Sequence, residues 1–218
     1  MPFSKEPTAA GMAVRTALIL FLFVVAFTTV LASMHALTAP AIQASAAEEE
    51  MRMIKETLPQ ALYDNDLLKD AKELPATAEI GQDQPSKVYL ATLQGKPSAI
   101  VLQVVAPDGY SGKIRMLVAV RSNGELAGVR VTQHKETPGL GDYIDPKKDK
   151  NKTRPWISQF DGLSFAKRTE KDWAVKKDGG QFDANAGATV TPRAVVKAVR
   201  KALRWAEANR EQLLANSK

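Results

Sequence analysis

The sequence predicts an α+β domain tethered to a membrane by a single N-terminal transmembrane helix. Two observations lead to this prediction. Residues Thr16–Leu37 form a run of 22 uncharged and mostly apolar residues, and the second half of the chain holds short β-rich runs followed by a long amphipathic helix. The composition is 44% hydrophobic and 25% charged, which is typical of globular proteins and excludes a chain that is disordered throughout. We therefore expect an antiparallel sheet with helices packed against it.

The apolar run is long enough to span a bilayer, since about 20 helical residues cross a hydrocarbon core of about 30 Å. Lys5 and Arg15 precede it, and Glu48–Glu50 follow it at a distance. Positive charge stays on the cytoplasmic side of membrane proteins. We therefore expect residues 1–15 to be cytoplasmic, residues 16–37 to span the membrane and the remainder to lie outside.

A cleaved signal peptide is the alternative interpretation of this N-terminus. Ala44-Ser45-Ala46 has the small-x-small form of a cleavage site. However, it lies several residues beyond the apolar run, and the run is longer than the usual apolar region of about 7–15 residues in a signal peptide. The sequence favours a retained anchor.

Residues 38–86 are predicted to be a juxtamembrane helix and a linker. Pro40 follows the span, and the next residues up to Pro59 are rich in Ala, Glu, Met and Lys, which favour a helix ending near that proline. Residues 63–86 are polar and interrupted by proline and glycine, so we expect a loop there.

The domain proper is predicted to occupy residues 87–218. Four short runs are rich in β-branched and apolar residues and are expected to be strands: Lys87–Leu93, Ala99–Ala106, Ile114–Arg121 and Leu126–Gln133. The Ser122-Asn123-Gly124 sequence between the last two predicts a hairpin, because Asn-Gly suits the positive φ angles of a type I′ turn. Residues 136–155 are rich in proline and glycine and are expected to be mostly loop, with a short helix over Pro155–Phe160.

The chain is predicted to end in a helix over residues 192–214. Thr191 is expected to be its N-cap, and Pro192 its first residue. The apolar residues recur at helical spacing and predict the face that packs on the sheet. They are Val195, Val196, Val199, Ala202, Leu203 and Ala206.

Composition excludes several kinds of site. The chain has no cysteine and only two histidines, which excludes disulfides, thiolate nucleophiles and iron–sulfur clusters and argues against a metal centre. The low aromatic content argues against a stacking surface for single-stranded nucleic acid, although the net charge is +6, and we expect no nucleic-acid partner. The cations of residues 147–154 and of the C-terminal helix are expected to be solvated surface, with an anionic docking surface as the alternative. We identify no catalytic residue; His134 beside Glu136 is a weak candidate for a general base.

The segment Asp183–Pro192 is the most informative stretch, because small residues lead directly into a helix start. Gly187 and Ala188 leave the backbone open to close approach, and Thr189 presents a hydroxyl before the helix. A helix N-terminus carries unpaired N–H groups and a partial positive charge, which suits a phosphate. An ordinary capping loop is the alternative that the residues alone leave open.

Four segments together resemble a known family. They are Ala106–Gly112 (APDGYSG), Val131–Asp142 (VTQHKETPGLGD), Trp173–Gly180 (WAVKKDGG) and Gly187–Val195 (GATVTPRAV). In this order they resemble the G subunits of the Rnf (Rsx) electron-transport complexes and, more distantly, the C subunits of the sodium-pumping NADH:quinone reductases. The anchor and external domain are also similar, so that the resemblance covers nearly the whole chain.

The resemblance implies a covalent FMN. In this family a flavin transferase joins FMN through its phosphate to the last threonine of a D-x-x-(S/T)-G-A-T motif, which here runs from Asp183 to Thr189. Thr189 is the implied acceptor, with Gly187 and Ala188 preceding it. Ala186 stands where the family usually has a hydroxyl residue, a departure that bears on the efficiency of attachment.

Further flavin contacts are expected from a second loop and a lysine. The loop Glu136–Gly141 is expected to approach the flavin ring, since Gly139 and Gly141 allow close backbone approach. Thr137 is expected to hydrogen-bond to the ring edge, and Leu140 lies in the same loop. Lys176, or its neighbour Lys177, is expected to offset charge on the reduced flavin.

The function implied is that of an electron-carrying membrane protein without an active site of its own. Its partners would be the other membrane subunits of an Rnf-type complex that couples electron transfer of the ferredoxin/NAD class to ion translocation. The domain would then lie on the periplasmic side of a bacterial inner membrane. The alternatives are a stand-alone membrane-anchored FMN-domain reductase or regulator, and a non-redox binding module.

Overall fold

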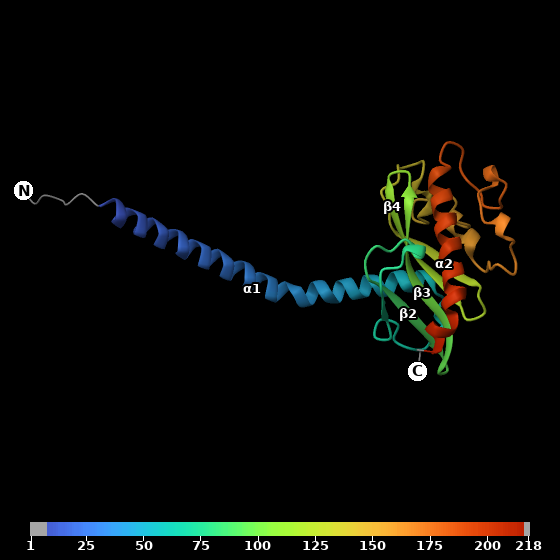
Figure 1. Ribbon diagram of the computed structural model, residues 1–218, viewed down its shortest axis with the longest axis horizontal. Coiled ribbons are helices and arrows are strands. Elements are labelled where there is room, and N and C mark those ends of the chain that lie inside the picture. Colours follow the sequence, from blue (N-terminus) through green and yellow to red (C-terminus); the bar gives the residue numbers. More distant parts are fainter. Residues whose placement is uncertain (1–7, 216–218) are drawn as a thin grey trace, which may run out of the picture. The chain divides into compact units, whose positions relative to one another are not determined.

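The computed structural model describes residues 8–215, and the chain divides into two units, one up to Glu49 and one from Glu50 onward (Figure 1). The first unit is helical, and the second contains the sheet and the C-terminal helix. The second unit takes in residues 50–86, which the sequence assigns to the juxtamembrane helix and linker. Lys5, which contributes to the predicted charge asymmetry, lies outside the described residues.

Helix α1 runs from Ala9 to Thr57 and contains the predicted span. Its most apolar window has a mean hydropathy of 2.5 with none of its residues buried, so α1 is long and apolar enough to cross a membrane. The predicted span and the predicted juxtamembrane helix form one continuous helix, because α1 continues through Pro40. A proline removes one backbone N–H donor. The Ala- and Glu-rich residues that follow favour the helix strongly enough to continue it.

The second unit is built on a five-stranded antiparallel sheet in the order β1-β2-β3-β4-β5. Its strands are β1 (Lys72–Leu74), β2 (Ser86–Leu93), β3 (Lys96–Gly109), β4 (Gly112–Arg121) and β5 (Leu126–Gln133). The four predicted strands are confirmed, and β3 extends beyond its prediction at both ends. The short strand β1 was not predicted, since it lies within residues 63–86, which were expected to be a loop. Its three residues show no alternating pattern and are mostly exposed.

The predicted hairpin at Asn123-Gly124 is confirmed, but the turn type is wrong. Gly124 has a φ of +85°, whereas Asn123 does not have a positive φ. The Gly124 N–H donates to the Arg121 carbonyl at 2.9 Å, and the Asn123 side chain accepts a hydrogen bond from the Glu125 N–H at 3.0 Å. Two successive positive φ values, typical of type I′, occur at the β2–β3 turn, where Gln94 has +52° and Gly95 has +71°.

Helix α2 (Val190–Ala215) covers one face of the sheet, as Figure 1 shows. Alternate strand residues such as Leu102 and Val118 pack with the predicted apolar stripe of α2 in a single core. Every member of that stripe is buried, and Val199 is fully buried. The prediction of an amphipathic helix that packs on the sheet is therefore confirmed.

The other face of the sheet is covered by the last turns of α1. Ile54 and Leu58 pack with the intervening strand residues, among them Val101 and Leu117. The approach is close, since a Cβ at Gly128 of β5 would lie 2.4 Å from the Thr57 carbonyl oxygen. The sheet is thus buried on both faces.

Candidate functional site

Three segments that are distant in sequence meet beside the start of α2. They are the β3–β4 turn at Tyr110-Ser111, the loop 136–141 after β5, and the segment 187–191. Together they surround a cavity of about 120 Å³, which we call the attachment pocket after the acceptor expected in the third segment; Thr189 itself lies beside the pocket and does not line it. These segments lie in three of the four stretches that carry the family resemblance.

A buried carboxylate joins the three segments. Glu136 is only 4% exposed, and its two oxygens serve different partners. Oε1 accepts a hydrogen bond from the Ser111 N–H at 3.0 Å, and Oε2 accepts one from the Thr191 hydroxyl. A buried carboxylate requires such donors because it has lost its hydration. Both oxygens of Glu136 are therefore engaged in holding the site together.

Two glycines make room for this carboxylate. A Cβ at Gly141 would lie 2.6 Å from the Thr191 hydroxyl oxygen and 2.9 Å from Glu136 Oε2. A Cβ at Gly109 would lie 2.9 Å from Glu136 Oε1. The space beside Gly141 is thus filled by the protein's own side chains.

Helix α2 begins two residues earlier than predicted. Its first residue is Val190, and the Thr189 carbonyl accepts a hydrogen bond from the Arg193 N–H at 3.2 Å. The predictions that Thr191 is the N-cap and Pro192 the first helical residue are therefore wrong. Proline is tolerated at the third position, because N–H groups in the first turn have no intrahelical partner. Pro192 has no N–H, so the backbone N–H groups of Val190 and Thr191 are the ones in the first turn that can bind a ligand.

Thr189 occupies the position just before α2. It is half-buried, and within residues 8–215 its hydroxyl makes no hydrogen bond. Gly187, two residues earlier, has a φ of +79°, and no atom lies within 4 Å of a Cβ built on it. The loop therefore has open space beside its backbone and a hydroxyl without a partner.

Tyr143 holds the same loop from the other side. Its hydroxyl donates to the Ala188 carbonyl at 3.3 Å and accepts from the Asn185 N–H at 3.2 Å. The ring is 6% exposed, and this burial raises the pKa of Tyr143 above its ordinary value of 10.0. The phenol is thus a neutral donor that fixes the residues leading to Thr189.

The attachment pocket has an apolar rim, which consists of Tyr110, Leu140 and Val190. These side chains are 69%, 51% and 44% exposed. Within the described part of the second unit, only one other large hydrophobic residue, Leu93, is exposed. Exposed apolar side chains that gather at one place indicate a binding surface.

The remaining predicted residues of the 136–141 loop form a turn. The Thr137 carbonyl accepts hydrogen bonds from the N–H groups of Leu140 and Gly141, each at 3.1 Å. Gly139 adopts a φ of +75°, and its N–H donates to Asp142 Oδ1 at 2.8 Å. This turn places Leu140 on the rim and leaves Thr137 lining the pocket.

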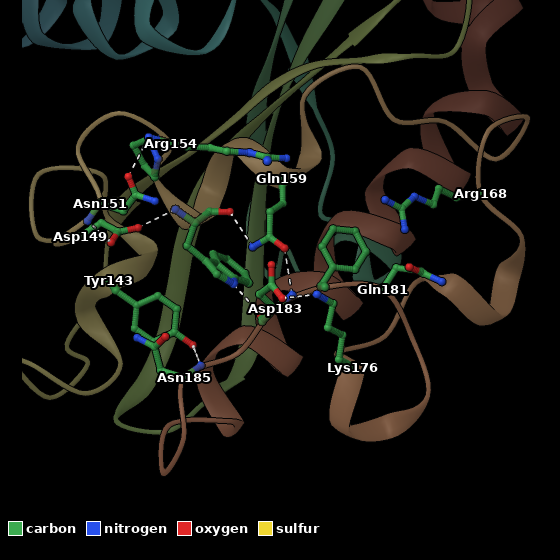
Figure 2. Close-up of a pocket in the computed structure, with 13 residues that line it drawn as sticks. Tyr143, Asp149, Asn151, Arg154, Gln159, Arg168, Lys176, Gln181, Asp183 and Asn185 are labelled. Atoms are coloured by element: carbon green, nitrogen blue, oxygen red, sulfur yellow. Dashed lines mark hydrogen bonds and ion pairs between the residues drawn. The ribbon is translucent and has the colours of Figure 1, made fainter.

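Asp183 and Lys176 lie elsewhere, at a larger cavity that we call the polar cavity (Figure 2). The Lys176 ammonium and Asp183 Oδ1 are 2.5 Å apart, and both side chains are largely exposed. The Asp183 backbone is held by Gln159 and Trp156: its N–H donates to Gln159 Oε1 at 2.9 Å, and its carbonyl accepts from Trp156 Nε1 at 2.6 Å. The polar cavity and the attachment pocket share no lining residue.

Sequence reasoning missed Tyr110, Ser111 and Tyr143 as residues of the site. Tyr110 and Ser111 lie inside a segment that carries the family resemblance, so their position beside a glycine-flanked turn was an available signal. Tyr143 had no signal of its own, because its role depends on a contact between residues 45 positions apart.

The cations of α2 are largely paired within the domain. Arg193 forms a two-bond ion pair with Asp178 at 2.5 Å, Lys197 pairs with Asp108, and Arg200 and Arg204 both reach Glu170. This face of α2 is therefore not a free cationic surface. His134 accepts a hydrogen bond at Nδ1 from the Glu136 N–H at 3.1 Å, a contact that stabilises the loop.

Comparison with known proteins matches two parts of the chain to family models and nearly the whole chain to relatives of one kind. Residues 11–57 match the RnfG N-terminal region, and residues 109–204 match the FMN-binding domain. The chain is 49% identical over 201 residues to the G subunit of the ion-translocating oxidoreductase complex of Pseudomonas aeruginosa, with 92% of each chain covered. It is 40% identical to the protein of the same name from Vibrio cholerae, with 91% of this chain and 92% of that one covered, and 39% identical to that of Shewanella baltica, with 93% of each covered.

The FMN-binding match includes all three segments of the attachment pocket, and the N-terminal match includes the apolar part of α1. The chain therefore belongs to the family of Rnf G subunits, as a membrane protein with one N-terminal apolar helix and an FMN-binding domain.

Proposed function

We propose that this chain carries one FMN joined through its phosphate to the Thr189 hydroxyl, and that it conducts electrons within an ion-translocating oxidoreductase complex. The observation that carries the proposal is the environment of Thr189. Its hydroxyl has no partner in the described chain, and it stands between an open glycine loop and a helix start.

The residues around Thr189 fit a phosphate ester. The ester keeps about one negative charge, which the N-terminal end of α2 stabilises through its partial positive charge and the N–H groups of Val190 and Thr191. Gly187 has no side chain that would obstruct a phosphate bound to Thr189, and the space beside it is open. No rearrangement of a buried hydrogen bond is needed, in contrast to Thr191, whose hydroxyl is bound to Glu136.

The rim of the attachment pocket fits the flavin ring. At about 120 Å³ the pocket is smaller than the usual small-molecule site of about 300–1,000 Å³, so a flavin held here would extend beyond it onto the exposed rim. There Tyr110, Leu140 and Val190 offer apolar surface to the faces of a planar ring. Thr137 offers a hydroxyl to its polar edge. An exposed ring suits a carrier that exchanges electrons with partner proteins.

FMN, when bound, supplies one- and two-electron redox chemistry that the side chains of this cysteine-free chain do not provide. The chain itself supplies position: Glu136 and Tyr143 fix the loops on either side of Thr189. A covalent bond keeps the cofactor on an exposed surface from which a weakly held flavin would dissociate.

The proposed partners are the other membrane subunits of the complex, together with a flavin transferase that forms the phosphoester. The relatives are named as subunits of an ion-translocating oxidoreductase complex, which supports this assembly. Arg15 before the apolar part of α1 and Glu48–Glu50 after it support a cytoplasmic N-terminus and a periplasmic FMN domain.

The test uses in-gel flavin fluorescence after complete denaturation, with the chain expressed in a host that has the flavin transferase. The wild-type chain should give a fluorescent band under ultraviolet light, and Thr189→Ala should give a dark band of equal protein content. Thr191→Ala is the matched control and should remain fluorescent. Ala186→Ser restores the family's usual hydroxyl and should hold or raise the signal. A fluorescent Thr189→Ala band would refute the proposal.

A further inference from the structure

The polar cavity is a second, separate feature of the domain, with a volume of about 560 Å³. This volume lies within the usual range for small-molecule sites, about 300–1,000 Å³. Its walls come from the segments 149–159 and 168–185 and from Tyr143. Trp156 and Phe182 form a rigid floor, since they are 7% and 2% exposed and pack with Phe160 in an aromatic cluster.

The carboxylates of the cavity are already satisfied. Asp149 is buried, and its two oxygens accept the backbone N–H groups of Asn151 at 2.9 Å and Trp156 at 2.5 Å. Asp183 is paired with the Lys176 ammonium. These groups shape the wall of the cavity and leave no carboxylate oriented to bind a cation.

The guanidinium groups of the cavity form no close ion pair among the described residues; Arg168 acts on Asp172 only as a nearby charge, which adds to the hydrogen bonds from Thr169 in lowering the pKa of that carboxyl. Within residues 8–215, Arg154 and Arg168 engage no partner through their side chains in a hydrogen bond or an ion pair. Figure 2 shows the two side chains entering from opposite sides of the cavity, with the end of the Arg154 side chain near Gln159. By contrast, the arginines of α2 at positions 193, 200 and 204 all have carboxylate partners within the domain.

We propose that the polar cavity binds a small molecule with two or more negative charges, a phosphate or polycarboxylate compound held between Arg154 and Arg168. Two planar guanidinium groups present forked donors that match phosphate and carboxylate oxygens. The side-chain amides of Asn151, Gln181 and Asn185 line the same cavity and supply further polar contacts. We take the ligand to be distinct from the flavin, because Thr189 does not line the polar cavity; the two sites adjoin through Tyr143 and Asn185, which line this cavity and are hydrogen-bonded to each other in front of the Thr189 loop.

The test is isothermal titration calorimetry of the detergent-solubilised full chain with pyrophosphate and with citrate, at constant ionic strength. At least one of the two should bind at a single saturable site, and the tighter of them identifies phosphate or carboxylate chemistry. The double variant Arg154→Gln/Arg168→Gln should bind at least roughly tenfold more weakly. The control Lys147→Gln/Lys148→Gln removes two cations of the neighbouring loop that do not line the cavity, and it should bind within about twofold of wild type.

The proposal also predicts equal binding by the flavin-bearing chain and by Thr189→Ala. Absence of saturable binding of either anion by both forms would overturn it, as would an equal loss in the lysine control, which indicates unspecific attraction. Binding by Thr189→Ala alone would also overturn it, because the flavin would then fill the cavity.

Discussion

The Thr191 hydroxyl donates a hydrogen bond to Glu136 Oε2 across 55 positions of the sequence, and both residues are buried. This bond connects the first turn of α2 to the loop that follows β5. It gives Thr191 a structural role and leaves the hydroxyl of Thr189, two residues earlier, as the one available for chemistry.

Thr191→Val should destabilise the domain by about 1–3 kcal/mol, because it keeps the shape of the side chain and removes one donor from a buried carboxylate. The measurement is urea unfolding of the purified chain. Thr191→Ser keeps the donor and should lose less stability than Thr191→Val. Equal stability of wild type and Thr191→Val would show that the hydrogen bond contributes nothing.

Val199→Asp should destabilise the domain by about 3 kcal/mol or more, because it places an unpaired carboxylate in the core between α2 and the sheet. Ala208→Asp is the control, since Ala208 is exposed on the same helix and the substitution should change stability by less than about 1 kcal/mol. Both are measured by thermal unfolding. Unchanged melting of Val199→Asp would contradict the packing of this face of α2.

Acid should weaken the domain partly through Asp178. The hydrogen-bonded Arg193 guanidinium lowers the pKa of Asp178 below its ordinary value of 3.8. The unfolded chain therefore binds this proton at a higher pH than the folded chain. The stabilisation is present above the unfolded pKa and is lost as the pH falls through the folded pKa.

Asp178→Asn tests this dependence on pH. The free energy of unfolding of wild type should exceed that of the variant by a constant amount above about pH 5, and the difference should shrink below about pH 4. The effect should be small because the pair is partly exposed and solvent screens it. A difference that grows on acidification would contradict the assigned pair.

The proposed topology is testable with single cysteines, because the chain has none of its own. Ala208→Cys is a suitable probe of the FMN domain, because Ala208 is exposed on α2. A membrane-impermeant maleimide should label Ala208→Cys in intact spheroplasts and should label Thr8→Cys only after lysis. The reverse pattern would place the FMN domain in the cytoplasm.

Local patterns in the sequence predicted most of the fold. The alternation in β2–β5 and the stripe of α2 reflect burial on a sheet face, which repeats at a fixed period and is visible in one chain. The errors occur where tertiary contacts decide. Strand β1 depends on its pairing with β2. The start of α2 depends on the hydrogen bond from the Thr191 hydroxyl to Glu136, which lies far away in the sequence.

The site was predictable to the extent that it is local. Thr189, Gly187 and Ala188 form one loop, and the family motif identifies them. The division of residues between two cavities was not predictable, because Asp183 belongs to the same motif yet pairs with Lys176 at the polar cavity. The rim residue Tyr110 reaches the site through the β3–β4 hairpin.

The most direct test of the central claim is tandem mass spectrometry of the tryptic peptide Asp178–Arg193 from the wild-type chain, which contains both Thr189 and Thr191. The account predicts a peptide heavier by FMN less one water, with fragment ions that assign the added mass to Thr189. Added mass on Thr191, or an unmodified peptide from a host with the flavin transferase, would contradict it.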